Sequence, residues 1–191
     1  IAEAALRFLK PNDCVYLDGG STVLALARLL NEMPRLTVIT NSLRVAGIFA
    51  AGGPKMILVG GEFRRLSQTF VGSLTRPLID NLHLDIAFMG TIGLTDSEIT
   101  TTDPAEAYTK ELVMRRAQQV ILLADSSKIG KVSFVKSGTL EDLDALITDS
   151  RARPADDATD ASSRAIPLNW TAHASCSRGA SAPRLGAFRA S

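Results

Sequence analysis

The sequence predicts an α/β protein with a mostly parallel, doubly wound sheet and helices on both faces. Short apolar, β-branched runs recur between residues 15 and 148, and each is followed by a cluster of Gly, Ser, Thr, Asn or Asp. Segments with helical spacing of apolar residues then lead to the next run. Continuous apolar runs are typical of parallel strands covered on both faces, and helical crossovers connect such strands.

The expected elements follow this alternation. Six strands are predicted, at Val15–Leu17, Thr37–Thr40, Met56–Val59, Ile86–Met89, Val120–Ala124 and Ala145–Thr148. Crossover helices are predicted at Thr22–Leu30, Ser42–Ala50, Phe70–Asn81 and Asp103–Gln118. An opening helix is expected to end near Leu9, because the turn sequence Lys10-Pro11-Asn12-Asp13 follows.

A change of composition divides the chain near residue 150. Residues 1–150 carry 15 Lys+Arg and 17 Asp+Glu, a net charge of −2, so this part has no basic footprint for nucleic acid. Residues 151–191 carry six Arg and three Asp, are rich in Ala, Ser and Pro, and contain no Lys or Glu. We predict one domain over 1–150 and a disordered tail over 151–191, whose abrupt start suggests a shifted reading frame or a divergent tail.

Composition argues against several classes of protein. A hydrophobic content of 46% and a charged content of 21% are ordinary for a soluble domain, and no apolar run could span a bilayer. The N-terminus has no export leader, so we expect a cytoplasmic protein without membrane partners. Two Cys and two His make a disulfide framework or a metal site improbable, and no cofactor is expected.

In open parallel sheets, ligands bind beyond the carboxyl ends of the strands. The first predicted strand ends in Asp18-Gly19-Gly20-Ser21-Thr22, where glycines let backbone N–H groups turn toward an anion and two hydroxyls add donors. Taken alone, the motif is as well explained by Ser21 or Thr22 capping the next helix. It lacks the Lys of a Walker loop and the third glycine of a dinucleotide fingerprint.

The second and third strands end in Thr40-Asn41-Ser42 and Gly60-Gly61-Glu62. A helix cap or a tight turn explains each of these loops alone. Three small polar loops at one sheet edge together favour a ligand site.

The fourth strand leads through Gly90-Thr91-Ile92-Gly93 to the helix start at Asp103. Asp103 and Glu106 have capping-box spacing, and Glu106 and Lys110 have the spacing of an exposed ion pair. Alternatively, these three side chains project into the cleft and bind hydroxyls and phosphate, or transfer a proton. Lys128, after the fifth strand, is either a phosphate contact or a solvated lysine.

Taken together, the motifs DGGST, VITNS, LVGGEF, FMG followed by TTTDPAEAYTK, and VILLADSSKIGK resemble the sensor domain of DeoR-family bacterial repressors over roughly residues 1–149. The resemblance implies a fold similar to ribose-5-phosphate isomerase and coenzyme A transferases. It also implies a homo-oligomer that binds a phosphorylated sugar or polyol and then releases DNA. By this resemblance the pocket comprises Asp18, Gly20, Ser21, Thr22, Thr40, Asn41, Ser42, Gly60, Asp103, Glu106, Lys110 and Lys128, with the phosphate at Gly20-Ser21-Thr22.

Two features depart from the family pattern. Family members begin with a winged helix-turn-helix, whereas this chain starts in what resembles the following connector, so DNA contact is expected only through an element absent from it. Residues 151–191 also lack the helix and closing strand that are usual there. Two other functions stay open: a sugar-phosphate isomerase with Asp103 or Glu106 as base, and a truncated regulator that pairs with intact subunits.

Overall fold

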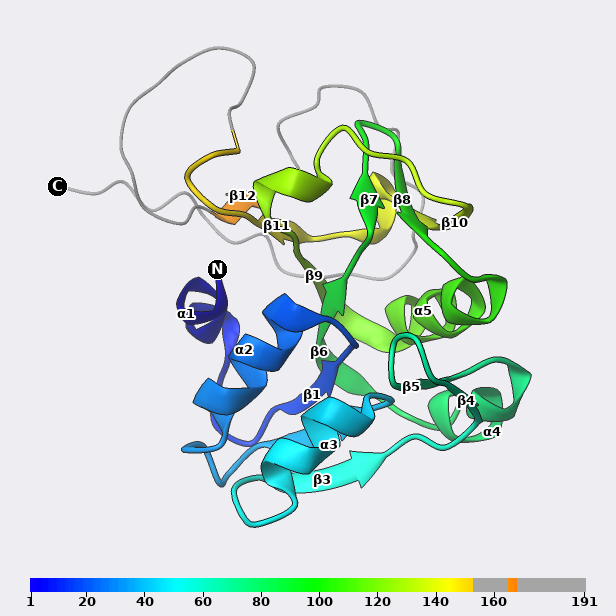
Figure 1. Cartoon of the computed structure of the whole chain (residues 1–191). Coiled ribbons are helices and arrows are strands. Elements are labelled where there is room, and N and C mark those ends of the chain that lie inside the picture. Colours follow the sequence, from blue (N-terminus) through cyan, green and yellow to red (C-terminus); the bar gives the residue numbers. More distant parts are fainter. Residues whose placement is uncertain (153–164, 168–191) are drawn as a thin grey trace, which may run out of the picture.

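A seven-stranded sheet forms the centre of the protein in a computed structural model that describes residues 1–152 and 165–167 (Figure 1). Its strand order is β12-β11-β9-β6-β1-β2-β3. The strands are β1 (Cys14–Leu17), β2 (Thr37–Thr40), β3 (Lys55–Leu58), β6 (Leu84–Gly90), β9 (Ala117–Leu123), β11 (Ala145–Ile147) and β12 (Ala165–Pro167). All neighbours pair in parallel except β11 and β12. The predicted fold class is therefore confirmed, with all six predicted strands present within a few residues of their expected bounds.

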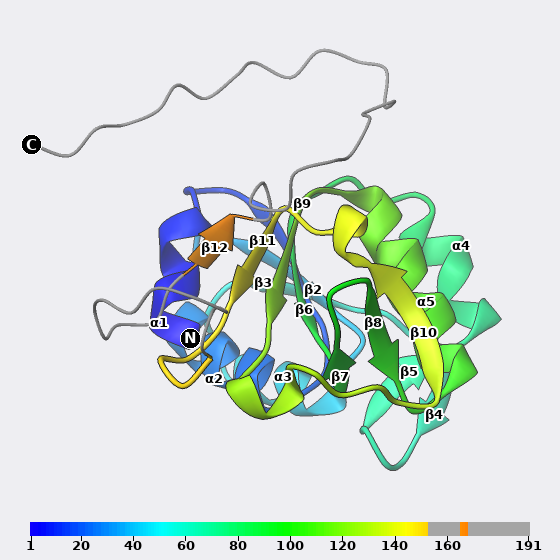
Figure 2. The same ribbon diagram turned by 90° about the horizontal axis from the view of Figure 1, so that it is seen from above.

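Helices cover both faces of this sheet (Figure 2). One face is covered by α1 (Ala2–Ala5), the 3₁₀ helix η1 (Leu6–Phe8), α2 (Ser21–Leu30) and α3 (Leu43–Phe49). The other face is covered by α4 (Arg76–Ile79) and α5 (Pro104–Arg116). Consecutive strand residues serve opposite cores, as Leu17 packs with α2 while Tyr16 packs with α5. Burial on both faces, worth about 1.5–3 kcal/mol per large side chain, explains the continuous apolar runs.

Two small antiparallel sheets lie beside the central one and were not expected from the sequence. The first is a hairpin of β4 (Glu62–Arg64) and β5 (Thr69–Val71). The second has the order β10-β8-β7 and consists of β7 (Gly93–Leu94), β8 (Glu98–Thr101) and β10 (Val135–Thr139). Both sheets lie on the side of the molecule that carries the polar loops, and they supply walls for the site described below.

The helix predicted over Phe70–Asn81 was wrong in its first half, where β5 and the 3₁₀ helix η2 (Ser73–Thr75) precede α4. The backbone of Phe70 is held from outside: its N–H donates to the carbonyl of Asn41 at 2.8 Å, and its carbonyl accepts from the Asn41 amide at 2.9 Å. Gly72 then has φ +86°, which lies outside helical geometry. Pairing with a distant segment replaces the helical ladder here. The helix predicted over Asp103–Gln118 also ends early, at Arg116, because β9 begins at Ala117.

Of the tail, the structure describes residues 151–152 and 165–167. The strand β12 was not expected there, and it pairs antiparallel with β11. Without β12, β11 would be an edge strand with unpaired backbone N–H and C=O groups, and such an edge readily pairs with another segment. The predicted disorder of residues 153–164 and 168–191 lies outside the described residues. No helix in the described part of the chain is long and apolar enough to cross a bilayer.

Candidate functional site

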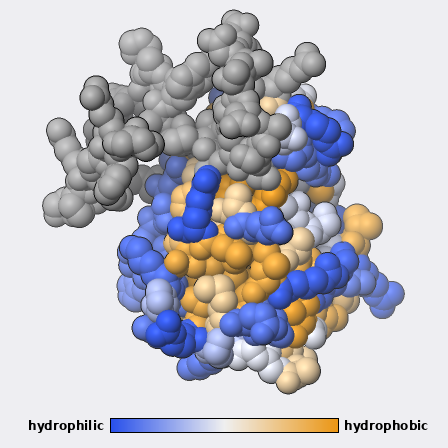
Figure 3. Space-filling view, turned by 90° about the vertical axis from the view of Figure 1, so that its left-hand side faces the viewer, coloured by the Kyte–Doolittle hydropathy of each residue, from blue (hydrophilic) through white to orange (hydrophobic). Residues whose placement is uncertain are grey.

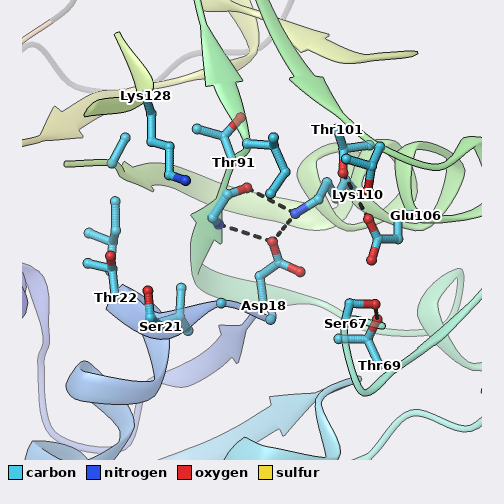
Figure 4. A pocket seen from close by; sticks show the side chains of 18 of the residues that line it. Asp18, Ser21, Thr22, Ser67, Thr69, Thr91, Thr101, Glu106, Lys110 and Lys128 are labelled. Atoms are coloured by element: carbon cyan, nitrogen blue, oxygen red, sulfur yellow. Dashed lines mark hydrogen bonds and ion pairs between the residues drawn. The ribbon is translucent and has the colours of Figure 1, made fainter. Parts of the chain in front are cut away.

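An open cavity of about 320 Å³ lies at the carboxyl ends of β1, β2, β6 and β9 (Figure 4). The turn after each of these strands contributes to its lining, as do the β4–β5 hairpin, the end of β8 and the start of α5. The volume suits a small molecule. The hairpin and β8 add walls to this edge of the sheet, and the cavity stays open to solvent on one side.

The start of α2 forms one wall of the cavity, and no side chain caps it. The N-cap residue is Gly20, whose φ of +121° favours glycine, and the helix begins at Ser21. Ser21 and Thr22 therefore do not cap α2, so helix capping by these residues does not explain the motif. The N–H groups of the first turn have no intrahelical partner and carry the positive end of the helix dipole. This wall suits an anion.

An ion pair between Asp18 and Lys110 forms the floor of the cavity. Oδ2 of Asp18 accepts from Nζ of Lys110 and, at 3.0 Å, from the backbone N–H of Gly90. Lys110 also donates to the Gly90 carbonyl at 2.9 Å. A Cβ on Gly90 would lie 2.7 Å from the Gly19 carbonyl oxygen, so this close approach requires glycine. The ion pair between Lys110 and Glu106 suggested by their spacing is replaced by this one.

A second charged network closes the cavity between the hairpin and α5. Oε2 of Glu106 accepts from the hydroxyl of Thr101 at 2.8 Å, and Oε1 lies 3.2 Å from the Arg64 guanidinium. Asp103 caps α5 by accepting from the N–H groups of Ala105 and Glu106, while its other oxygen lies 3.3 Å from Nε of Arg64. Arg64 thus ties the hairpin to the start of α5.

Two cations that line the cavity make no ion pair within the described part of the chain. Lys128 belongs to the 3₁₀ helix η3 (Ser126–Lys128), and its side chain points into the cavity on the side where Ser21 and Thr22 lie (Figure 4). Arg44, in the first turn of α3, is exposed. Hydrogen bonds from Ser127 lower the pKa of Asp125, the remaining carboxylate in the lining.

The structure brings together eight of the twelve residues expected in the pocket. These are Asp18, Gly20, Ser21, Thr22, Asn41, Glu106, Lys110 and Lys128. Ligand contact by them stays a prediction.

The other four, Thr40, Ser42, Gly60 and Asp103, lie outside the lining. The hydroxyl of Thr40 donates to the Leu17 carbonyl at 2.6 Å, and Ser42 caps α3, so both shape the turn after β2. Gly60 does not line the cavity, and residues of the β4–β5 hairpin that follows it line this part of the cavity instead.

Sequence reasoning missed Arg44 and the residues of the hairpin and of β8, among them Arg64, Ser67, Thr69 and Thr101. Arg44 lies two residues after the Thr40-Asn41-Ser42 motif, so its position could have indicated it. Nothing local marks the hairpin residues, which reach the cavity only through tertiary pairing.

The fold and the cavity define an α/β protein with a cavity of small-molecule size at the carboxyl edge of a parallel sheet. Solved structures share this fold: ribose 5-phosphate isomerase A from Neisseria gonorrhoeae matches 87% of this chain and 94% of its own, with a TM-score of 0.58 and 11% identity. The β subunit of eIF2B from Chaetomium thermophilum matches 76% of this chain and 46% of its own, with a TM-score of 0.52 and 16% identity. These likenesses concern the fold alone.

The chain belongs to the DeoR family, since residues 1–150 match the family described as the DeoR C terminal sensor domain. The lactose phosphotransferase system repressor of Streptococcus mutans is 37% identical over 152 residues, which cover 78% of this chain and 60% of the relative. The transcriptional regulator GolR of Listeria innocua is 38% identical over 158 residues, covering 81% and 62%. The chain therefore spans about three fifths of the length of these relatives.

Proposed function

We propose that this domain binds a phosphorylated sugar or polyol and thereby controls DNA binding by the transcriptional regulator to which it belongs. The main support is the side of the cavity that is lined by both the uncapped start of α2 and the side chain of Lys128. Backbone N–H groups, the hydroxyls of Ser21 and Thr22, and a lysine without an ion pair among the described residues together suit a phosphate group.

The name of one relative supports the same class of ligand, and the names of others support a regulatory role. One is a repressor of a lactose phosphotransferase system, and relatives from Bacillus subtilis are named GlcR and IolR, both HTH-type transcriptional regulators. Regulation follows if the ligand binds two conformations of the regulator with different affinities.

The isomerase alternative is less well supported, because the two carboxylates considered as its base are already engaged. Asp103 caps α5 outside the cavity lining, and both oxygens of Glu106 accept from Thr101 and Arg64. A general base must reach the proton that it removes. Isomerisation of D-ribose 5-phosphate by the purified chain would favour the enzyme.

We also propose that the protein forms a homo-oligomer. The face that carries α1 and α2 exposes a contiguous hydrophobic area with hydrophilic residues around it (Figure 3). Apolar areas of this kind often mark association sites. Light scattering coupled to size-exclusion chromatography is expected to give a mass above 20.4 kDa. A monomer at all concentrations would also remove the basis for pairing with intact subunits.

Ligand binding is tested by thermal shift and calorimetry with D-ribose 5-phosphate, D-fructose 6-phosphate, D-glucose 6-phosphate and sn-glycerol 3-phosphate. At a hundredfold excess over Kd a ligand stabilises by about 2.7 kcal/mol, which raises the Tm by about 5–10 °C. Inorganic phosphate and the unphosphorylated sugars serve as controls. A folded protein that none of these phosphates stabilises would contradict the proposal.

The contribution of Lys128 to phosphate binding is tested by the variant Lys128→Ala, with Lys131→Ala as its matched control. Lys131 is exposed in the same loop and does not line the cavity. A charge-assisted hydrogen bond is worth about 1.5–3 kcal/mol, so Lys128→Ala is expected to weaken binding by about tenfold to a hundredfold. Equal affinities for the two variants would exclude Lys128 from the phosphate site.

A further inference from the structure

Arg44 is a charged residue of the cavity lining whose side chain is unpaired within the described part of the chain. The other charged lining residues are Asp18, Glu106, Asp125, Lys110, Arg64 and Lys128. Lys110 and Arg64 form ion pairs with two of the carboxylates, and Lys128 ends the 3₁₀ helix that Asp125 caps. The guanidinium of Arg44 makes no hydrogen bond or ion pair with any described residue. A ligand in the cavity therefore meets it as an open positive charge.

The position of Arg44 in α3 gives it no structural role. Arg44 is exposed and lies in the first turn of the helix, two residues after the N-cap Ser42. The unpaired N–H groups of a first turn repel a cation, so an arginine is less favourable there than a neutral residue. Positions at which a residue departs from the local preference are often functional. The fold therefore does not explain Arg44, whereas an anion in the cavity would.

Arg44 and Lys128 reach the cavity from different strands. Arg44 follows β2 and Lys128 follows β9, with β1 and β6 between these strands in the sheet. The three strand spacings amount to about 14 Å. The N–H of Leu43 donates to the carbonyl of Gln68 at 2.9 Å, so the start of α3 lies beside the β4–β5 hairpin. The two cations therefore suit two anionic groups joined by a short carbon chain better than they suit a single phosphate.

We propose that Arg44 binds a second anionic group of the ligand, so that the domain prefers a sugar or polyol with a phosphate at one end and another anionic group at the other. The planar guanidinium group matches the oxygens of both phosphate and carboxylate. Sugar bisphosphates and phosphorylated aldonic acids belong to this class of ligand. The inference rests on the proposed function, which requires only the phosphate beside α2, and adds the chemistry of the opposite end of the ligand.

Calorimetry on the full chain tests this with two pairs of ligands. One pair is D-fructose 6-phosphate and D-fructose 1,6-bisphosphate, and the other is D-glucose 6-phosphate and 6-phospho-D-gluconate. A charge-assisted hydrogen bond from Arg44 is expected to make the doubly anionic member bind about tenfold more tightly in at least one pair. A preference in the first pair identifies the second group as a phosphate, and a preference in the second pair identifies it as a carboxylate. No preference in either pair would overturn the inference.

Three variants assign the preference to Arg44. Arg44→Gln removes the charge and is expected to reduce the preference to below about threefold, while the affinity for the monoester stays within about twofold. Arg44→Lys keeps the charge and is expected to retain more of the preference than Arg44→Gln. Arg65→Gln is the matched control and is expected to leave the preference unchanged, because Arg65 is exposed in the turn of the hairpin and does not line the cavity.

Thermal unfolding without ligand separates a binding role of Arg44 from a structural one. Arg44→Gln is expected to have a Tm equal to or above that of the wild type, and a lower Tm would overturn the inference. The inference is also overturned if Arg44→Gln weakens the binding of both members of a pair by the same factor, because Arg44 would then contact the first phosphate. If none of the four ligands binds, the proposed function fails and the inference fails with it.

Discussion

Gly90→Ala is expected to destabilise the protein, because the carboxyl ends of β1 and β6 approach each other too closely for a methyl group. The new Cβ would lie 2.7 Å from the backbone oxygen of Gly19, which no side-chain rotation relieves. Overpacking of this kind costs about 1–3 kcal/mol. A shift of β6 would also weaken the hydrogen bond from Gly90 to Asp18, worth about 1.5–3 kcal/mol to a charged acceptor. Together we expect a loss of about 2–5 kcal/mol.

Gly47→Ala is the matched control for this prediction. Gly47 lies within α3, and a Cβ there would meet nothing within 4 Å. Alanine in an exposed helix is favoured over glycine by about 0.8–1 kcal/mol, so the same chemical change is expected to stabilise the protein here. Urea denaturation followed by circular dichroism measures both variants. A Gly90→Ala variant as stable as the wild type would refute the close-approach argument.

Two further predictions concern a helix cap and a buried phenol. Asp103→Ala removes the cap of α5 and a partner of Arg64, and is expected to cost about 0.5–2 kcal/mol in urea denaturation, whereas Asp103→Asn retains most of the stability. Burial, and to a smaller extent the charge of Asp18, raises the pKa of Tyr16 well above its ordinary value of 10.0. Neutral Tyr16 therefore stabilises the fold fully below pH 10, and this stability is lost as the pH rises toward the folded-state pKa. Between pH 8 and pH 11, Tyr16→Phe is expected to lose less stability than the wild type; equal losses would exclude this linkage.

The six parallel strands of the central sheet were predictable because their signals are local. Each strand is a continuous apolar run, since its successive side chains enter the two cores on opposite faces. The small sheets were not predictable, because their short strands, such as Glu62–Arg64 and Val135–Thr139, lack a continuous apolar run that would mark them. Phe70 illustrates this: its segment has apolar spacing compatible with a helix, yet its backbone pairs with Asn41, 29 residues earlier.

The residues of the candidate site also divide into those that local sequence patterns predict and those that they do not. Residues directly after strands, such as Ser21 and Lys128, could be gathered from the sequence, because the carboxyl ends of parallel strands meet at one edge of the sheet. Residues brought by the hairpin, such as Arg64, could not. Local spacing also suggested the wrong partner for Lys110, which pairs with a carboxylate 92 residues away rather than with Glu106.

The amino-acid sequence by itself determined the parallel α/β architecture, the sheet edge at which a ligand would bind, and the family. Periodicity and strand-end motifs carry that information, because they reflect what each segment must bury or expose locally. Only the tertiary structure decided that α2 begins without a capping side chain, that Asp103 acts as a cap, and that Asp18 holds Lys110 while one of its oxygens faces the cavity. The pairing of Asp18 with Lys110 depends on distant groups that meet in a buried space, where ion pairing and desolvation select among partners that local spacing leaves equivalent. The two helix starts depend on local backbone geometry, which decides between alternatives that the sequence left open.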